Sequence, residues 1–136
     1  MPKFGRRSLS QLNSCHPKLI ELFREVVKGF DCSVLKGHRN KEEQDECFRI
    51  GSSEKEWPNS EHNRLPSKGV DVAPYYKEKP HIRWKDRERF YFFAGYVKGI
   101  AASMGIKIRF GCDWDGDTEV HDQTLFDLPH YEIVED

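Results

Sequence analysis

Apolar residues recur at intervals of three and four in the first quarter of the chain, the spacing that places them on one face of a helix. The stripe consists of Leu19, Leu22, Phe23, Val26 and Val27. Pro17 suits the first turn of a helix and Gly29 suits a helix end. The pattern predicts an amphipathic helix over 17–29, after a shorter helical region that begins at Ser8.

Two more helices are predicted downstream. Asn40 and Glu43 have the spacing of a capping box, so a helix is expected from Lys41 to about Ile50. The longest helix is expected over 83–104, where apolar residues again recur with helical spacing. The residues expected to face the core are Phe90, Phe93, Ala94, Val97, Ile100 and Ala101.

Short segments between these helices have the composition of strands. They are 32–36, 70–74, 106–110 and 131–134. The polar segment 51–67 has no apolar period, and a loop of that length in a compact domain is usually functional or disordered. Helices and short strands alternate irregularly. This favours an α+β fold, a small and mainly antiparallel sheet with helices packed against it, in a single domain over 1–136.

Charge and composition exclude several classes of function. Lys plus Arg (22) nearly balances Asp plus Glu (23), a net charge of −1, whereas nucleic-acid binding normally needs a basic excess. Without a long apolar run no membrane insertion is expected, and without an apolar segment after Arg6 and Arg7 no secretory signal peptide is expected. The protein is therefore expected in the cytosol. The widely spaced cysteines are read as structural: Cys15, Cys32, Cys47 and Cys112.

Metal-binding residue types gather beside two strand candidates. His62 and Asp71 lie around the start of the second strand, and His130 lies just before the fourth. Two histidines and a carboxylate are a typical ligand set of catalytic zinc, which keeps a further position for water. Asp71 lies among apolar residues, where burial of an unpaired carboxylate is costly and a cation would offset that cost. A single histidine is more often a surface or hydrogen-bonded residue than a metal ligand. The hypothesis therefore rests on the combination of the two histidines with Asp71.

A zinc hydrolase also needs a base and a cation near the substrate. Asp127 precedes His130 by three residues and Glu132 follows it by two, so spacing alone leaves both open as the base. Arg39, at the end of a strand, is the best-placed cation for stabilising charge on the substrate. His81 is a fallback ligand if His62 is not one.

These segments resemble the zinc metallopeptidase superfamily of D-alanyl-D-alanine dipeptidases and carboxypeptidases and phage L-alanyl-D-glutamate endopeptidases. The resemblance runs over about 33–133. It rests on Ser60-Glu-His62, on Asp71, on Asp127-Leu-Pro-His130, and on Gly37-His-Arg39 followed by Gln44. One departure is the separation of His62 from Asp71 by eight residues, where six are common in the family.

The resemblance implies zinc at His62, Asp71 and His130, with Asp127 rather than Glu132 as the base and Arg39 near the substrate. It implies a phage-type endolysin that hydrolyses an amide bond of peptidoglycan stem peptides, between L-alanine and D-glutamate. We expect a monomer that is made in the host cytoplasm and reaches the wall after holin-dependent release. Two alternatives stay open: a D-alanyl-D-alanine carboxypeptidase, or a non-catalytic wall-binding or virion module with a closed, four-ligand structural metal.

An acidic segment, 113–119, is the remaining conspicuous feature. Asp113, Asp115 and Asp117 alternate with other residues, a pattern that suits a hard cation such as Ca²⁺. The glycine and the twelfth residue do not fit an EF-hand. A second cation and a solvated acidic loop are both consistent with this pattern.

Overall fold

The computed structural model describes residues 2–111 and 127–135. Two helices, α1 (Arg6–Leu12) and α2 (Pro17–Gly29), precede strand β1 (Cys32–Lys36). Helix α3 (Lys41–Arg49), the 3-10 helix η1 (Glu61–Asn63) and strand β2 (Gly69–Pro74) follow. The long helix α4 (Arg87–Ser103) leads to strands β3 (Ile108–Gly111) and β4 (Asp127–Ile133).

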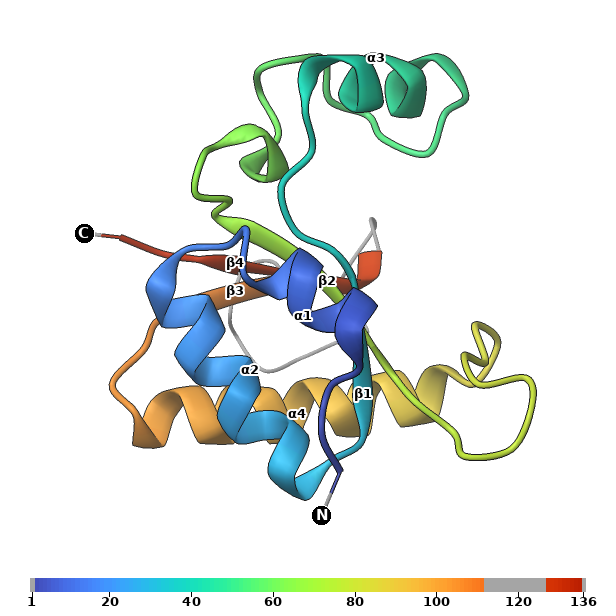
Figure 1. Cartoon of the computed structure of the whole chain (residues 1–136), viewed down its shortest axis with the longest axis vertical. Helices are drawn as coiled ribbons and strands as arrows, with labels where there is room; N and C mark the ends of the chain where they lie inside the picture. Colours follow the sequence, from blue (N-terminus) through green and yellow to red (C-terminus); the bar gives the residue numbers. More distant parts are fainter. Residues whose placement is uncertain (1, 112–126, 136) are drawn as a thin grey trace.

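The strands form one antiparallel sheet in the order β1-β2-β4-β3. Figure 1 shows α2 and α4 side by side against the sheet, with α3 apart from them at the top of the molecule. The α+β class predicted from the sequence is confirmed. No helix among the described residues is long and apolar enough to span a membrane.

The two faces of the sheet differ because neighbouring residues of a strand point in opposite directions. Val70, Val72 and Tyr131 belong to the buried core. The ring of Tyr131 makes edge contacts with Phe23 of α2 and Phe93 of α4, with centroids 5.4 and 6.1 Å apart. The alternate residues of β2 and β4 therefore lie on the face away from these helices.

Helix α4 begins later than predicted, at Arg87 rather than 83. Asp86 caps it by accepting a hydrogen bond from the backbone N–H of Arg89 at 3.2 Å. Arg83 belongs to the preceding loop, where its Nε donates to the carbonyl of Pro80 at 3.1 Å. The apolar stripe of this helix begins only at Phe90 and so does not mark the first turn, and the predicted start was wrong for that reason.

Both C-terminal strands are shifted from their predicted bounds. β3 begins at Ile108, because Ile106 closes the end of α4 by donating its N–H to the carbonyl of Ala101 at 2.9 Å. Gly105 lies between them with φ of +70°, a conformation that favours glycine. β4 begins at Asp127, four residues before the predicted Tyr131.

Candidate metal centre

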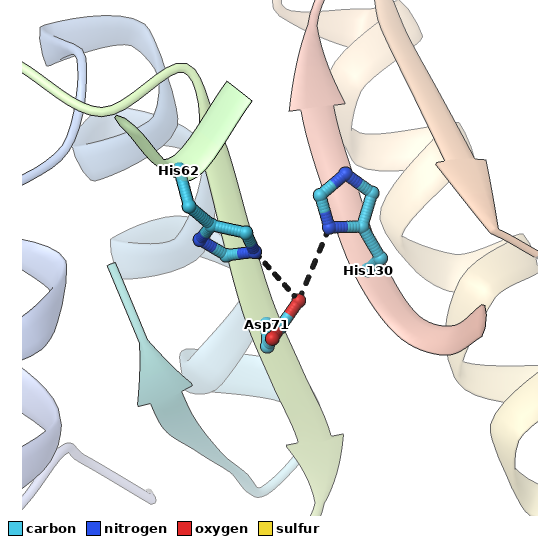
Figure 2. Close-up of side chains that lie close together, drawn as sticks. All are labelled: His62, Asp71 and His130. Carbon is cyan, nitrogen blue, oxygen red and sulfur yellow. Dashed lines mark hydrogen bonds and ion pairs between the residues drawn. The ribbon is translucent and has the colours of Figure 1, made fainter. Parts of the chain in front are cut away.

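Three side chains from separate elements meet on the open face of the sheet. His62 comes from η1, Asp71 from β2 and His130 from β4. Asp71 Oδ1 lies 3.1 Å from His62 Nε2 and 3.1 Å from His130 Nδ1. The candidate ligand atoms all lie within 4.8 Å of one another, and Figure 2 shows both rings directed at the carboxylate.

Strand register brings two of these residues together. Asp71 and His130 are direct partners in the antiparallel pairing of β2 with β4. Two residues before Asp71, Gly69 lets His130 and η1 approach the strand closely. A Cβ at this position would lie 3.0 Å from His130 Cε1 and 3.3 Å from the backbone nitrogen of His62. The absence of a side chain at Gly69 is therefore part of the site.

His62 is held by its backbone and by its ring. Ser60 caps η1 and accepts a hydrogen bond from the N–H of His62 at 3.2 Å, while the carbonyl of His62 accepts from the N–H of Arg39 at 2.8 Å. The ring Nδ1 lies 2.7 Å from the carbonyl oxygen of Gly37. Because a carbonyl only accepts, Nδ1 carries the proton, and Nε2 presents a lone pair to Asp71.

His130 is oriented in the same way by a carboxylate. Its Nε2 lies 2.8 Å from Glu132 Oε1, so Nε2 donates and Nδ1 presents its lone pair to Asp71. Glu132 Oε2 in turn accepts from the Nη2 and Nε of Arg109 at 2.6 and 3.2 Å. Arg109 and Glu132 are partners in the pairing of β3 with β4.

These contacts leave three acceptors facing one point. With both imidazoles neutral, two ring lone pairs and a carboxylate oxygen converge, an arrangement that repels itself unless a cation lies among them. Two histidines and one carboxylate fit zinc with an open position, and a histidine ligand normally donates its other N–H to a carboxylate or carbonyl. No fourth Cys, His, Asp or Glu joins the group among the side chains that the structure describes, those of residues 2–111 and 128–135. The residues present fit a catalytic metal ion.

The carboxylates of the site stay ionised at neutral pH. Burial raises the pKa of Asp71. Without a cation, the charge of His62 and hydrogen bonds from both rings, with a proton on each nitrogen that faces Asp71, outweigh it and hold this pKa well below its usual range. Burial also raises the pKa of Glu132, and hydrogen bonds from His130 and Arg109 bring it down to about 2. Asp71 therefore places one negative charge within the group of candidate ligands, and Glu132 places a second one behind the His130 ring.

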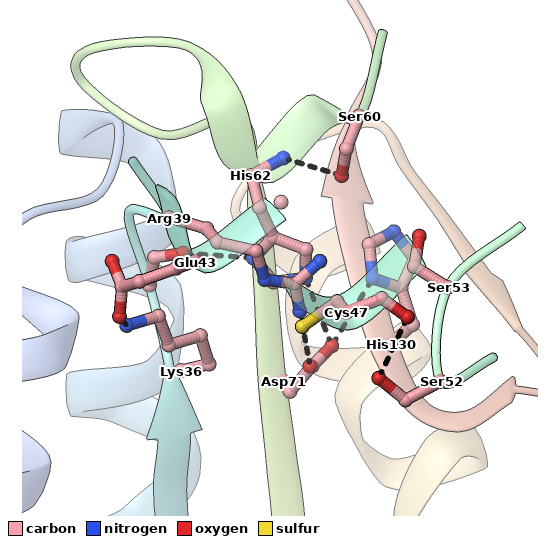
Figure 3. A network of polar contacts seen from close by, with 12 residues as sticks. Lys36, Arg39, Glu43, Cys47, Ser52, Ser53, Ser60, His62, Asp71 and His130 are labelled. Atoms are coloured by element: carbon pink, nitrogen blue, oxygen red, sulfur yellow. Dashed lines mark hydrogen bonds and ion pairs between the residues drawn. The ribbon is translucent and has the colours of Figure 1, made fainter. Parts of the chain in front are cut away.

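Arg39 lies at the edge of this group, as Figure 3 shows. Its Nη2 is 4.0 Å from Asp71 Oδ2, and its side chain is 13% exposed. Arg39 directly precedes Asn40, whose side chain accepts from the N–H of Glu43 at 2.8 Å in the predicted capping box. The start of α3 therefore fixes where this cation enters the site.

Comparison with known proteins places the chain in a family. The model of the phage L-alanyl-D-glutamate peptidases matches residues 1–134. The chain belongs to this family. It is 29% identical over 137 residues to the L-alanyl-D-glutamate peptidase of Escherichia phage T5, covering 97% of this chain and 98% of that protein. The expected family and the expected class of enzyme are confirmed.

A solved structure agrees with the fold. The crystal structure of Serratia marcescens L-Ala D-Glu endopeptidase ChiX matches this peptidase with a TM-score of 0.76 at 26% identity. The match covers 98% of this chain and 91% of that chain. The likeness thus extends over the sheet, its helices and the strands that carry the site.

Most predicted site residues of this peptidase can now be located. His62, Asp71 and His130 lie together with Arg39 beside them. His81 lies outside this group, with its Nδ1 2.8 Å from the carbonyl oxygen of Tyr76.

Other predicted residues are located only in part or not at all. Asp127 is the first residue of β4, and its side chain lies outside the described part of the structure. Asp113, Asp115 and Asp117 lie outside the described residues, so the second-cation hypothesis remains a prediction.

Several contributors to the site were not found from the sequence. The carbonyl of Gly37 has no sequence signal, since every residue has one. Arg109 could have been found, because alternation in the predicted strand 106–110 turns it away from the core, but its partner depends on strand register. Gln44 was noted only as part of the resemblance, and the structure buries it completely.

Proposed function

We propose that this protein is a zinc-dependent endopeptidase that hydrolyses the L-alanyl-D-glutamate bond of peptidoglycan stem peptides. One observation carries the proposal: His62 Nε2, His130 Nδ1 and Asp71 Oδ1 converge in a chain of the phage peptidase family, and the other ring nitrogen of each histidine is hydrogen-bonded. The names of the phage T5 and Serratia relatives support the choice of bond.

Each residue has a defined part in this proposal. His62, Asp71 and His130 hold the ion, which when bound supplies the Lewis acidity that polarises a carbonyl and activates water near neutral pH. Asp127 is the proposed general base, which accepts a proton from the attacking water and passes it to the leaving amine. The guanidinium of Arg39 stabilises negative charge that develops on the substrate.

The experiment is mass spectrometry of the soluble products released from purified peptidoglycan by the zinc-loaded protein. Asp127→Ala is the matched variant, because it removes the proposed base and leaves the three ligands in place. The expected result is a new free amino terminus on D-glutamate with wild type and a large loss of that product with the variant. Zinc content and circular dichroism of both proteins serve as controls.

Other products would change the proposal. Loss of terminal D-alanine would identify a carboxypeptidase. An Asp127→Ala variant as active as wild type would reject Asp127 as the base. No product from folded, zinc-loaded wild type on several wall chemotypes would reject the hydrolytic function. We further propose that the protein is made in the host cytoplasm and acts on the wall after release, as its family likeness implies.

A further inference from the structure

Gln44 is a buried polar residue on an otherwise solvated helix. It is 0% exposed, and it is the residue that α3 buries, whereas most of its neighbours on this helix are exposed. Burial of an amide is unfavourable unless its hydrogen-bonding groups are satisfied. The contacts of this side chain therefore indicate why α3 carries it.

The amide of Gln44 uses all of its hydrogen-bonding capacity. Its Oε1 accepts from Arg39 Nη1 at 2.9 Å and from Asn63 Nδ2 at 3.1 Å. Its Nε2 donates to Ser53 Oγ at 3.0 Å and to the carbonyl of Lys55 at 2.6 Å. A primary amide has two acceptor positions and two donors, so the four contacts complete the set. With donors at one end and acceptors at the other, the amide has one favourable orientation.

This orientation acts on the guanidinium of Arg39. Gln44 binds Nη1, and the neighbouring Nη2 is the atom that faces Asp71 Oδ2 at 4.0 Å. Because a guanidinium is planar and rigid, holding one of its nitrogens restricts the direction of the others. Figure 3 shows Arg39 reaching from the start of α3 towards the Asp71 carboxylate.

The same amide also connects to the segment that carries His62. Asn63 donates to Gln44 and to the carbonyl of Arg39, the latter at 3.1 Å, and it follows His62 directly in η1. In the described part of the chain no hydrogen bond joins Gln44 to His62, Asp71 or His130. Its influence on the site therefore passes through Arg39 and Asn63.

We propose that Gln44 is a positioning residue that holds the Arg39 guanidinium in the direction needed to stabilise charge on the substrate. Helix α3 carries this side chain, and the 53–55 segment accepts both hydrogen bonds from its Nε2. The inference rests on the proposed function, because it takes Arg39 to act on the substrate of the peptidase. It adds a residue that acts through Arg39 and does not itself contact substrate or metal.

The test is a double-mutant cycle on purified, zinc-loaded protein with a soluble stem peptide as substrate. Gln44→Leu removes the four hydrogen bonds, and Arg39→Ala removes the group that Gln44 is proposed to hold. Misplacement of a charged group by about 1 Å can cost on the order of 100-fold in rate. We expect Gln44→Leu to lower kcat/KM by about 10- to 100-fold, and most of this loss is expected in kcat rather than in KM.

The double variant distinguishes a positioning role of Gln44, which acts through Arg39, from a general effect of Gln44 on the fold. In the Arg39→Ala background, Gln44→Leu is expected to lower kcat/KM by less than about threefold, because the residue it positions is gone. Zinc affinity, measured by competition with a chromophoric chelator, is expected to stay within about twofold of wild type, because the three ligands are untouched.

The control variant is Asp45→Asn, which removes an exposed ion pair with Lys41 on the same helix and leaves the contacts of Gln44 in place. It is expected to keep kcat within about threefold of wild type. If Gln44→Leu does not fold at the assay temperature, Gln44→Met, which is unbranched and close in size, replaces it.

Three results would overturn the inference. One is wild-type kcat in folded Gln44→Leu or Gln44→Met. Another is an equal fold-loss from the Gln44 change with and without Arg39, which would mean that Gln44 acts independently of it. The third is a loss of zinc affinity that accounts for the loss of activity. Inactivity of wild type itself would instead reject the proposed function.

Discussion

Replacing Glu132 by alanine is expected to weaken zinc binding at the proposed site by about 10- to 100-fold, the usual effect of losing the group that orients a histidine ligand. Glu132 Oε1 accepts from His130 Nε2 at 2.8 Å, and its side chain is 5% exposed. Without this acceptor the ring of His130 loses the hydrogen bond that fixes its tautomer and its direction. The expected loss corresponds to about 1.4–2.8 kcal/mol of binding free energy.

The same change is expected to reduce the stabilisation of the fold by zinc. At a zinc concentration about 100 times the wild-type Kd, binding stabilises the folded state by about 2.7 kcal/mol. A variant that binds 100-fold more weakly gains only about 0.4 kcal/mol at that concentration. For a chain of this size these values correspond to zinc-induced rises in Tm of roughly 8–13 °C for wild type and about 1–2 °C for the variant.

The assays are chelator competition for Kd and thermal unfolding by circular dichroism with and without zinc. Glu135→Ala is the matched control, because it removes an exposed carboxylate near the end of the chain that pairs with His16 and Lys68. It is expected to leave zinc affinity within about twofold of wild type. The zinc affinity of Glu132→Gln is expected to lie between those of wild type and Glu132→Ala. An amide can still accept from His130, but it turns an N–H towards Arg109.

A zinc affinity of Glu132→Ala within twofold of wild type would refute this reasoning. It would mean that the hydrogen bond between His130 and Glu132 does not determine how Nδ1 is presented. An equal loss in Glu135→Ala would refute it differently, by showing that total negative charge, not orientation, sets the affinity.

Three further predictions follow from the described residues. Gly69→Ala is expected to lower kcat/KM by about tenfold or more with the fold retained, because the new Cβ would lie 3.0 Å from His130 Cε1; unchanged kinetics would contradict this. Burial raises the pKa of Cys15 to about 12, so iodoacetamide at pH 8 should label the half-buried Cys47 well before Cys15, as peptide mapping would show. The pKa of Glu132 is lowered to about 2, so its contribution to the stability of the metal-free protein is complete above the unfolded value near 4.5 and is lost as pH falls towards 2; acid unfolding of Glu132→Ala should be less steep in that interval.

Local signals in the sequence were sufficient for most helices and strands. The capping box of Asn40 and Glu43 placed the start of α3, and the apolar stripe after Pro17 placed α2 with both of its ends. These features depend on residues within one or two turns of each other, so a sequence shows them directly. The start of α4 was missed because its apolar stripe begins only at Phe90 and does not mark the first turn of the helix, which begins at Arg87.

The grouping of His62, Asp71 and His130 was predictable from residue types beside strands together with the family resemblance. The residues that orient it were not, because their contacts join positions far apart in the chain. Arg109 meets Glu132 through the register of β3 with β4, and Gln44 meets Asn63 across 19 residues. Such pairings depend on how the strands and helices are assembled, which periodicity and composition do not encode.

The structure also bears on the choice of base that spacing left open. Both oxygens of Glu132 are already engaged, Oε1 with His130 Nε2 and Oε2 with Arg109. Glu132 lies behind the His130 ring, on the nitrogen that faces away from Asp71, whereas a base must reach water on the side where the ligand atoms converge. Its pKa near 2 also makes it a weak proton acceptor. These contacts favour the proposed role of Asp127 and assign Glu132 to orientation, so Asp127→Ala should abolish turnover and spare zinc affinity while Glu132→Ala lowers zinc affinity first.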